Sequence, residues 1–318
     1  MAHLVETMAY AGEVPWHGLG VKVPADLSPD QMLTQAGLDW AVEKKPAFVE
    51  IENKRILTGW NALTRSSDNS ILDIVSNEWN PVQNHDAFKF FNEYCVAGDM
   101  EMHTAGSLKN GQIVWALAKV KESFELFKGD QVDSYLLFTN PHKFGQAIDV
   151  RFTPIRVVCN NTLTLSLAAD TKSVVKVNHR AVFDAEKVKE MLGIATHKLA
   201  KYKEMAQFLG SKQFKEESVK DYFKVIFPSL SDQSKPHARA ANIDMSRAAS
   251  KAMEVLYTQP GFKYAEGTWW QPFNAVTYLT DHVLGRSSDS RLASAWYGAN
   301  KNLKIKALEE AVRFAEAA

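Results

Sequence analysis

Residues 100–120 read MEMHTAGSLKNGQIVWALAKV, and this stretch decides the fold. Two β-prone segments, 100–108 and 112–120, flank Lys109-Asn110-Gly111. The Asn-Gly dipeptide readily supplies the positive φ angles that a two-residue hairpin turn requires. The stretch therefore predicts an antiparallel hairpin, which a helix across Gly111 would contradict.

Strand patterns also precede this hairpin. Residues 39–65 contain two β-prone runs separated by Glu52-Asn53-Lys54-Arg55, which predicts another hairpin, and residues 71–75 predict a short third strand. A helix is expected after Asn80-Pro81, because apolar residues recur there at helical spacing. The opening of the chain is thus predicted to have the order β-β-β-α.

Further short strands follow the central hairpin. The expected segments are 124–127, 132–139 and 146–158, with a turn at Gly129-Asp130. Sequential short strands with tight connections favour antiparallel pairing. Asn160 or Asn161 is then expected to cap a helix over 162–169.

A helical period dominates from Asp184 onward. The predicted helices cover about 184–209, 216–227, 239–257, 272–285 and 299–317. The polar segment SLSDQSKP at 229–236 is the best linker candidate. We therefore expect an α+β protein. Its mixed region, 1–170, has an antiparallel sheet with a packed helix, and 171–318 forms a mainly helical region packed with it as one unit.

The composition is that of a globular protein. Of 318 residues, 46% are hydrophobic and 23% are charged, so a large core can form without metals or cross-links. Cys95 and Cys159 are the only cysteines, and we expect both to remain reduced and unpaired. No secretory pattern or membrane-spanning run occurs. The expected location is the cytoplasm of a bacterial host cell, with no membrane partner.

The charge is balanced overall but distributed unevenly. The net charge is zero, yet residues 1–150 contain 12 basic and 20 acidic side chains, whereas 171–263 contain 17 and 10. The excess of basic residues predicts a basic face on a neutral protein. The alternative is that these lysines only solvate exposed helix faces.

Five motifs spread along the chain carry a family resemblance. They are GEVPWHGLG at 12–20, NPVQN at 80–84, TAGSL at 104–108, FTPIRVVCNNTL at 152–163 and FNAVTYLTDH at 273–282. Together they resemble the phage and plasmid-like protein family catalogued as domain of unknown function nine-three-two. The resemblance implies a mobile-element context and no known reaction. The predicted β-β-β-α opening and meander are also similar to phage single-strand annealing proteins, an analogy of fold alone.

No motif indicates catalysis, a metal or a cofactor. The glycines of PWHGLG at 15–20 fit neither a dinucleotide fingerprint nor a phosphate loop. Cys159 with His142 or His179 would need an orienting third group to act as a nucleophile, and a buried structural cysteine is the simpler interpretation. The histidines, Asp281-His282 included, lack metal-ligand spacing. We therefore expect no catalytic residues, no metal and no cofactor.

The residues around 151–161 are the best candidates for binding nucleic acid. Arginine and asparagine donors gather where a strand is expected to meet a helix, and such a junction can bind a phosphate. Basic residues that follow extend this candidate site, and Phe144 and Phe152 could stack on bases. The predicted nucleic-acid-binding residues are Arg151, Arg156, Asn160, Asn161, Lys172, Lys176 and Arg180.

These features favour a non-enzymatic protein that binds single-stranded DNA, assists phage or plasmid recombination or annealing, and forms a homo-oligomer. Two other functions stay open. One is an unrecognised enzyme acting on nucleic acid or a nucleotide, with polar residues gathered around His142, Arg156 and Asn160. The other is a host-interaction protein with an exposed aromatic surface.

Overall fold

The computed structural model describes residues 5–12, 19–156, 161–162, 174–193, 196–229, 245–284, 294 and 299–318. Its contacts divide the chain into two compact units. The first unit comprises Met1–Glu122, Ser134–Phe152 and Thr171–Thr196, and the second comprises Ser123–Asp133, Thr153–Asp170 and His197–Ala318. The chain passes between the units several times, so this division differs from the single boundary expected near residue 170.

The main sheet has eight strands in the order β10-β9-β8-β7-β6-β1-β2, and β11 also pairs with β9. β6 runs antiparallel to both β1 and β7, whereas β1 and β2 run parallel. The α+β class is confirmed, although strands β1 and β2 were not predicted. The strands are β1 (Val5–Ala11), β2 (Val21–Val23), β6 (Met100–Leu108), β7 (Ile113–Phe127), β8 (Asp130–Pro141), β9 (Ile148–Arg156), β10 (Asn161–Thr162) and β11 (Val174–Val177).

The predicted central hairpin is confirmed as β6–β7. Leu108 pairs with Ile113, so the connection has four residues, 109–112, instead of the two expected. The loop is longer because three successive residues adopt left-handed backbone, with φ values of 54° at Lys109, 57° at Asn110 and 83° at Gly111. Asn and Gly tolerate this conformation better than other residues.

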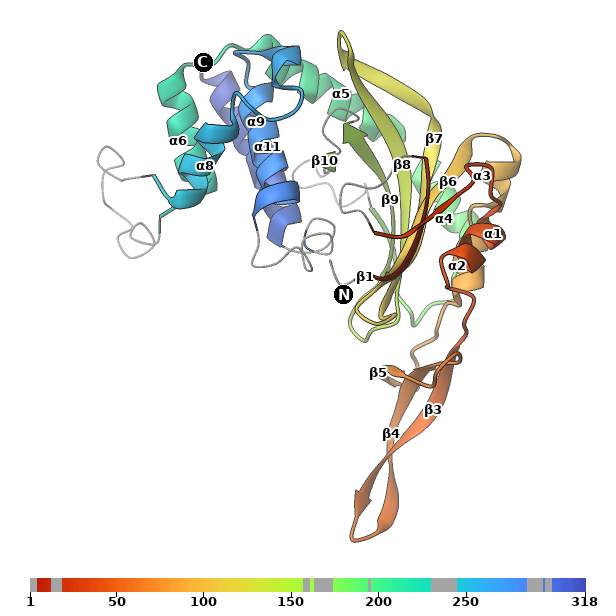
Figure 1. Cartoon of the computed structure of the whole chain (residues 1–318). Coiled ribbons are helices and arrows are strands. Elements are labelled where there is room, and N and C mark those ends of the chain that lie inside the picture. Colours follow the sequence, from red (N-terminus) through yellow and green to blue (C-terminus); the bar gives the residue numbers. More distant parts are fainter. Residues whose placement is uncertain are drawn as a thin grey trace. The chain divides into compact units, whose positions relative to one another are not determined.

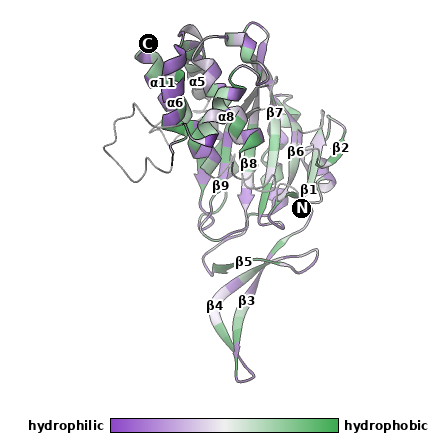
Figure 2. Cartoon of the chain, turned by 60° about the vertical axis from the view of Figure 1, so that its left-hand side comes forward, coloured by the Kyte–Doolittle hydropathy of each residue, from purple (hydrophilic) through white to green (hydrophobic). Residues whose placement is uncertain are grey.

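A second sheet, in the order β3-β4-β5, stands apart from the main sheet of the same unit. It consists of β3 (Val42–Ile51), β4 (Lys54–Arg65) and β5 (Ile71–Ser76), all antiparallel. The predicted hairpin and third strand are thus confirmed, but they form their own sheet. We call the β3–β4 hairpin, residues 42–65, the arm. Figure 1 shows the arm extending away from the main sheet, and Figure 2 shows hydrophobic stretches on both of its strands.

Four short helices complete the first unit: α1 (Pro29–Gln35), α2 (Asn84–Lys89), α3 (Asn92–Val96) and α4 (Ala185–Gly193). The helix predicted after Asn80-Pro81 is divided into α2 and α3. Its residues Phe88, Phe90 and Phe91 are fully buried, and the rings of Phe90 and Phe138 lie 5.4 Å apart. Aromatic packing therefore fixes these helices against the main sheet (Figure 1).

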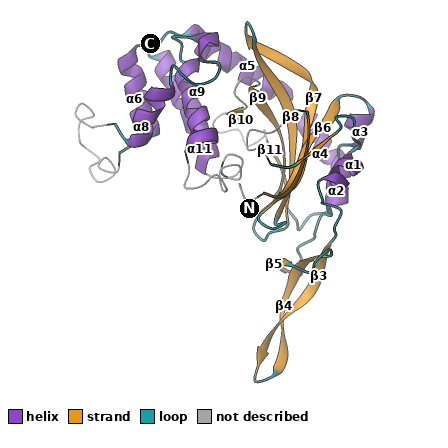
Figure 3. Ribbon diagram, in the orientation of Figure 1, coloured by secondary structure: helices purple, strands orange, loops and turns teal. Residues whose placement is uncertain are grey.

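The second unit is mainly helical (Figure 3). Large aromatic side chains such as Tyr222, Trp269 and Phe273 fill its core, and Leu126 and Val132 from the β7–β8 hairpin belong to the same core. Helices predominate among the described residues from 184 onward, but strand β11 lies within the region 171–318 that was expected to be helical. The linker proposed at 229–236 lies almost wholly outside the described residues. The elements are α5 (Thr196–Ser211), α6 (Glu216–Ile226), α8 (Arg247–Val255), η4 (Phe262–Ala265), α9 (Trp270–Tyr278), η5 (Leu279–Val283) and α11 (Ala299–Glu316).

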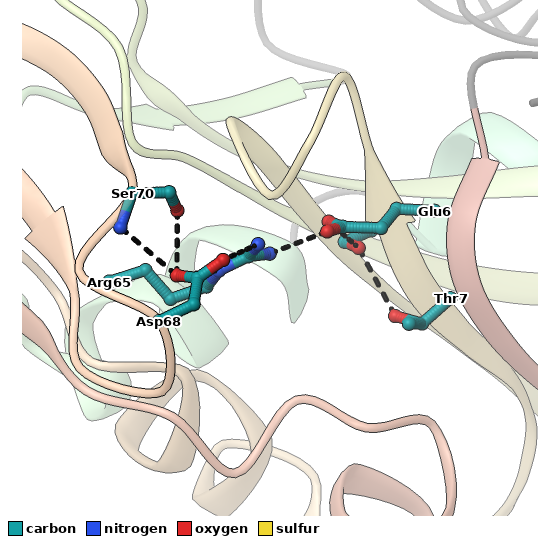
Figure 4. Close-up of polar contacts among 6 residues, drawn as sticks. Glu6, Thr7, Arg65, Asp68 and Ser70 are labelled. Atoms are coloured by element: carbon teal, nitrogen blue, oxygen red, sulfur yellow. Dashed lines mark hydrogen bonds and ion pairs between the residues drawn. The ribbon is translucent and has the colours of Figure 1, made fainter.

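A polar cluster anchors the arm to the main sheet (Figure 4). Arg65, the last residue of β4, donates from Nη1 to Glu6 of β1 at 2.7 Å, and from Nε and Nη2 to Asp68 at 3.0 and 2.7 Å. Asp68 also accepts from the backbone and hydroxyl of Ser70, while Ser107 of β6 donates to Glu6 at 3.1 Å. The hydrogen bonds that Arg65 donates to Asp68 and Glu6 raise the pKa of Arg65, and Arg65 in turn lowers the pKa of Asp68. Arg65 and Asp68 therefore both stay charged over the physiological pH range.

We expect Arg65→Ala to lower the free energy of unfolding by about 2–3 kcal/mol, because it leaves the partly buried Glu6 carboxylate without its positively charged partner. Urea unfolding followed by circular dichroism measures this loss. The matched control is Arg180→Ala, which removes an exposed arginine 3.7 Å from Glu78 and should cost less than about 1 kcal/mol. Equal losses for the two variants would contradict an anchoring role for Arg65.

Candidate functional site

Two of the predicted nucleic-acid-binding residues lie on neighbouring strands, β9 and β11. Arg151 on β9 is buried, and its Nε lies 2.9 Å from Oδ1 of Asp149. Its guanidinium is therefore held by an internal carboxylate instead of facing a solvent-exposed phosphate. Lys176 on β11 pairs with Asp149 in the backbone register, and its side chain is exposed.

Arg180 is also exposed, three residues beyond the end of β11, with its Nε 3.7 Å from Glu78. Arg156 and Asn161 pair through their backbones as the ends of β9 and β10. The expectation that Asn161 caps a helix is wrong, because Asn161 and Thr162 continue the sheet. Asn160 and Lys172 lie outside the described residues, as do the side chains of Arg156 and Asn161.

An exposed pair of aromatic rings lies at the base of the arm. The rings of Trp60 on β4 and Phe144 in the β8–β9 connection are 5.7 Å apart and edge to face. Trp60 is 44% exposed and Phe144 is 45% exposed. The backbone N–H of Phe144 donates to Asp73 of β5 at 2.8 Å, which fixes the connection beside this strand. Phe152, the other candidate for base stacking, is buried.

The strand register brings Arg180 to the same end of the main sheet as Phe144. Val177, the last residue of β11, pairs with Ile148, the first residue of β9. Arg180 and Phe144 therefore both lie just beyond this end of the β9–β11 pair. Trp60 pairs with Ser76, two residues before the Glu78 that contacts Arg180. Exposed aromatic and basic side chains consequently gather around the end of β5.

The NPVQN motif at 80–84 makes a buried polar network in the same unit. The side-chain amide of Asn84 donates to the carbonyls of Leu38 and Trp40, so its Oδ1 is left to accept from His142 Nε2 at 2.9 Å. Gln83 forms two hydrogen bonds with the backbone of Val42, at 2.8 and 3.0 Å. The motif thus joins the start of the arm to the end of β8.

His142 is completely buried and neutral. Because its Nε2 donates to Asn84, the second ring nitrogen, Nδ1, carries no proton, and it has no hydrogen-bond partner among the described residues. Burial, with a smaller contribution from His179, lowers the pKa of His142 to about 3. Protonation would place a charge in a site that offers it no acceptor.

His179 occupies the other end of the network. Its ring stacks on Trp79 with centroids 4.2 Å apart, and its Nδ1 donates to the Asn80 carbonyl at 3.2 Å. The N–H of Asn80 donates back to the His179 carbonyl at 2.8 Å. Burial lowers the pKa of His179, although the carbonyls of Asn80 and Pro141 oppose this shift. Both histidines are enclosed and neutral, so their arrangement suits a structural role better than proton transfer to a substrate.

The other candidate reactive groups that are described are either partly buried or held in internal ion pairs. Cys95 is a free thiol, and burial raises its pKa to about 11, so it is not activated as a nucleophile. Cys159 lies outside the described residues. In the second unit, the Asp281 carboxylate lies 2.8 Å from the Lys304 ammonium in a fully enclosed ion pair. Within the described part of the chain, no group of three or more His, Cys, Asp or Glu side chains could hold a metal ion.

The sequence pointed to Phe144 but not to Trp60 as an aromatic available for stacking. The sequence signal that contains Trp60 is the apolar run of Ile56, Leu57 and Trp60, which places apolar residues on both faces of one strand. In a single sheet such a run indicates burial on both sides. Here it belongs to an arm without such cover, where all three side chains are exposed.

The model of the family described as Domain of unknown function (DUF932) matches residues 71–296, more than two thirds of the chain. The chain therefore belongs to this family. The match begins at the first residue of β5, and it contains Phe144, the NPVQN motif and Asp281. No curated protein matches the chain, and no solved structure matches it. Among the described helices, none has both the length and the apolar character needed to cross a membrane.

The two buried histidines predict a loss of stability in acid. The unfolded chain binds protons near the ordinary histidine pKa of about 6.5, whereas folded His142 does not until about pH 3. The stabilisation is therefore complete above about pH 6.5 and falls as the pH drops toward 3, by up to about 1.4 kcal/mol per pH unit for each histidine. Urea unfolding at intervals between pH 7 and pH 5 measures this slope.

The variant His142→Gln removes one of the two groups that take up a proton on unfolding. It should therefore reduce this slope by up to about 1.4 kcal/mol per pH unit. His85→Gln is the matched control, since His85 is exposed on α2, and it should leave the acid-induced loss in place. A slope unchanged by His142→Gln would show that other groups cause the loss.

Proposed function

We propose that this DUF932 family member is a non-enzymatic protein that binds single-stranded DNA and assists recombination or annealing of phage or plasmid DNA. The observation that carries the proposal is the exposed Trp60–Phe144 pair, with Lys176 and Arg180 exposed toward the same end of the sheet. Single-strand binding combines aromatic faces, on which bases stack, with cations that contact the phosphates. Both groups are fixed on strands or tight connections of one unit.

Annealing requires no covalent catalyst. Cations that neutralise phosphates reduce the repulsion between two strands, and bases stacked on aromatic rings keep their pairing edges available. The enclosed, neutral histidines and the paired Asp281 are consistent with this type of function. The expected sequence preference is weak, because every base offers a face for stacking.

A second candidate function is binding to another protein. Several large apolar side chains are exposed along the arm, and such surfaces are typical of protein interfaces. This surface includes Trp60, so the aromatic pair alone does not distinguish the two functions. Binding to DNA and binding to protein differ in their salt dependence, which separates them by experiment.

We expect Trp60→Ala and Phe144→Ala each to weaken binding to a single-stranded oligonucleotide by about 1–3 kcal/mol, roughly 5- to 150-fold in Kd. Fluorescence anisotropy measures the affinity, and circular dichroism establishes that each variant is folded. The matched control is Tyr257→Ala, which removes an aromatic side chain exposed to the same degree in the second unit. The absence of binding by the unmodified protein at low salt would reject the proposed function.

The basic residues make a separate prediction about salt. Replacement of Lys176 or Arg180 by Ala should weaken binding to all sequences alike and reduce the salt slope by about 0.7 for each phosphate that the variant no longer neutralises. Lys22→Ala is the matched control, because Lys22 is exposed on β2 at the opposite edge of the main sheet. A variant with unchanged affinity and slope would remove its residue from the site.

A further inference from the structure

We propose that the outer part of the arm, residues 47–59, docks on a second copy of this chain. Five large apolar residues of this segment are between 47% and 72% exposed: Phe48, Val49, Ile51, Ile56 and Leu57. They lie beyond the point where β5 stops pairing with β4. The inference is independent of DNA binding, because it concerns a different part of the arm and a different kind of partner.

The strand register places apolar side chains on both faces of the outer arm. Phe48 pairs with Leu57, and the next pair along, Val49 with Ile56, points to the opposite face. An isolated two-stranded ribbon is at best marginally stable in water, and three strands or a packed helix are normally needed. The outer arm continues from a three-stranded sheet but has no third strand of its own among the described residues, so a partner that covers it would stabilise it.

The exposed apolar area is enough for the centre of an interface. With Ile71 and Ile74 on β5, seven large apolar residues of this sheet are exposed to about half on average. Burial of such a side chain is worth about 1.5–3 kcal/mol at about 25 cal/mol per Å², so the seven together present on the order of 300 Å² of apolar surface. The polar rim that surrounds the apolar centre of an interface would supply the rest of the roughly 800 Å² that each partner normally buries.

The charges at the end of the arm favour a second copy. The register pairs Glu50 with Arg55, and Glu52 and Lys54 complete a segment with two carboxylates and two cations. In a two-fold interface, residue i meets residue j of the partner and j meets i, so this segment can complement itself. A nucleic acid would instead meet as many carboxylates as cations. Arg55 also lies 4.7 Å from the centroid of the Phe48 ring, where it covers part of the apolar surface.

The backbone of the outer arm is also open to pairing. β5 pairs with β4 only from Trp60 to Thr64, so among the described strands no third strand covers β4 between residues 54 and 59. β3 is an edge strand, and the register shift between Pro46 and Phe48 interrupts its ladder with β4. Open edges of this kind pair readily with another strand.

The test is the association state of the purified full-length protein, measured without DNA by sedimentation velocity across a range of concentrations. A nuclease-treated sample at about 0.5 M salt, where the Debye length is below about 8 Å, excludes bridging by nucleic acid. We expect the unmodified protein to associate reversibly. Leu57→Lys, which places a charge at the most exposed apolar position of the arm, should raise the dissociation constant at least about tenfold.

The matched control is Val96→Lys, because Val96 is 89% exposed at the end of α3 and does not belong to the arm. This variant should associate like the unmodified protein, and circular dichroism should show that all three proteins are folded. A protein that stays monomeric at every concentration would overturn the inference. Association that Leu57→Lys leaves unchanged, or that nuclease abolishes, would overturn it equally.

Discussion

The position of the arm depends on one partly buried arginine. Arg65 is the last residue of β4, where the chain leaves the arm. Its guanidinium contacts Glu6 of the main sheet and Asp68 of the following turn, and its Cζ lies 5.6 Å from the centroid of the Trp40 ring. The β6–β7 turn forms another wall of this site, because a Cβ atom at Gly111 would lie 3.1 Å from Nη1 of Arg65. Gly111 thus satisfies two requirements, since the turn needs its positive φ and the arginine needs the space. A local turn and a long-range ion pair therefore support each other.

The buried polar networks of this protein specify one arrangement of the fold, and their geometry suits this structural role better than a catalytic one. Asn84 and His142 can hydrogen-bond as they do only if the start of the arm, α2 and the end of β8 meet in one arrangement. A buried polar group without its partner costs more than a buried apolar one, so alternative packings are disfavoured. The NPVQN motif is explained by this geometry, whereas the surfaces suited to binding lie in the arm and at the end of β5.

The sequence was sufficient for the features that local chemistry determines. The hairpin at Asn110-Gly111, the arm and most of the helices follow from turn residues and from the period of apolar positions. Partner choice between distant segments could not be derived in this way. Nothing near Val5–Ala11 indicates that it pairs with β6. For the same reason the exposure of Trp60 could not be derived, because it depends on where the arm lies in the unit.

The β7–β8 hairpin has a consequence for the order of folding. Leu126 and Val132 belong to the core that α6, α9 and α11 complete, and α11 ends only at Glu316. During synthesis this hairpin leaves the ribosome long before the last of its helical neighbours. Contacts so distant in sequence form slowly, and their apolar surface stays open to misassembly in the meantime. The second unit is therefore expected to finish folding only after α11 has been synthesised, and fragments that end before α11 should depend on chaperones to remain unaggregated.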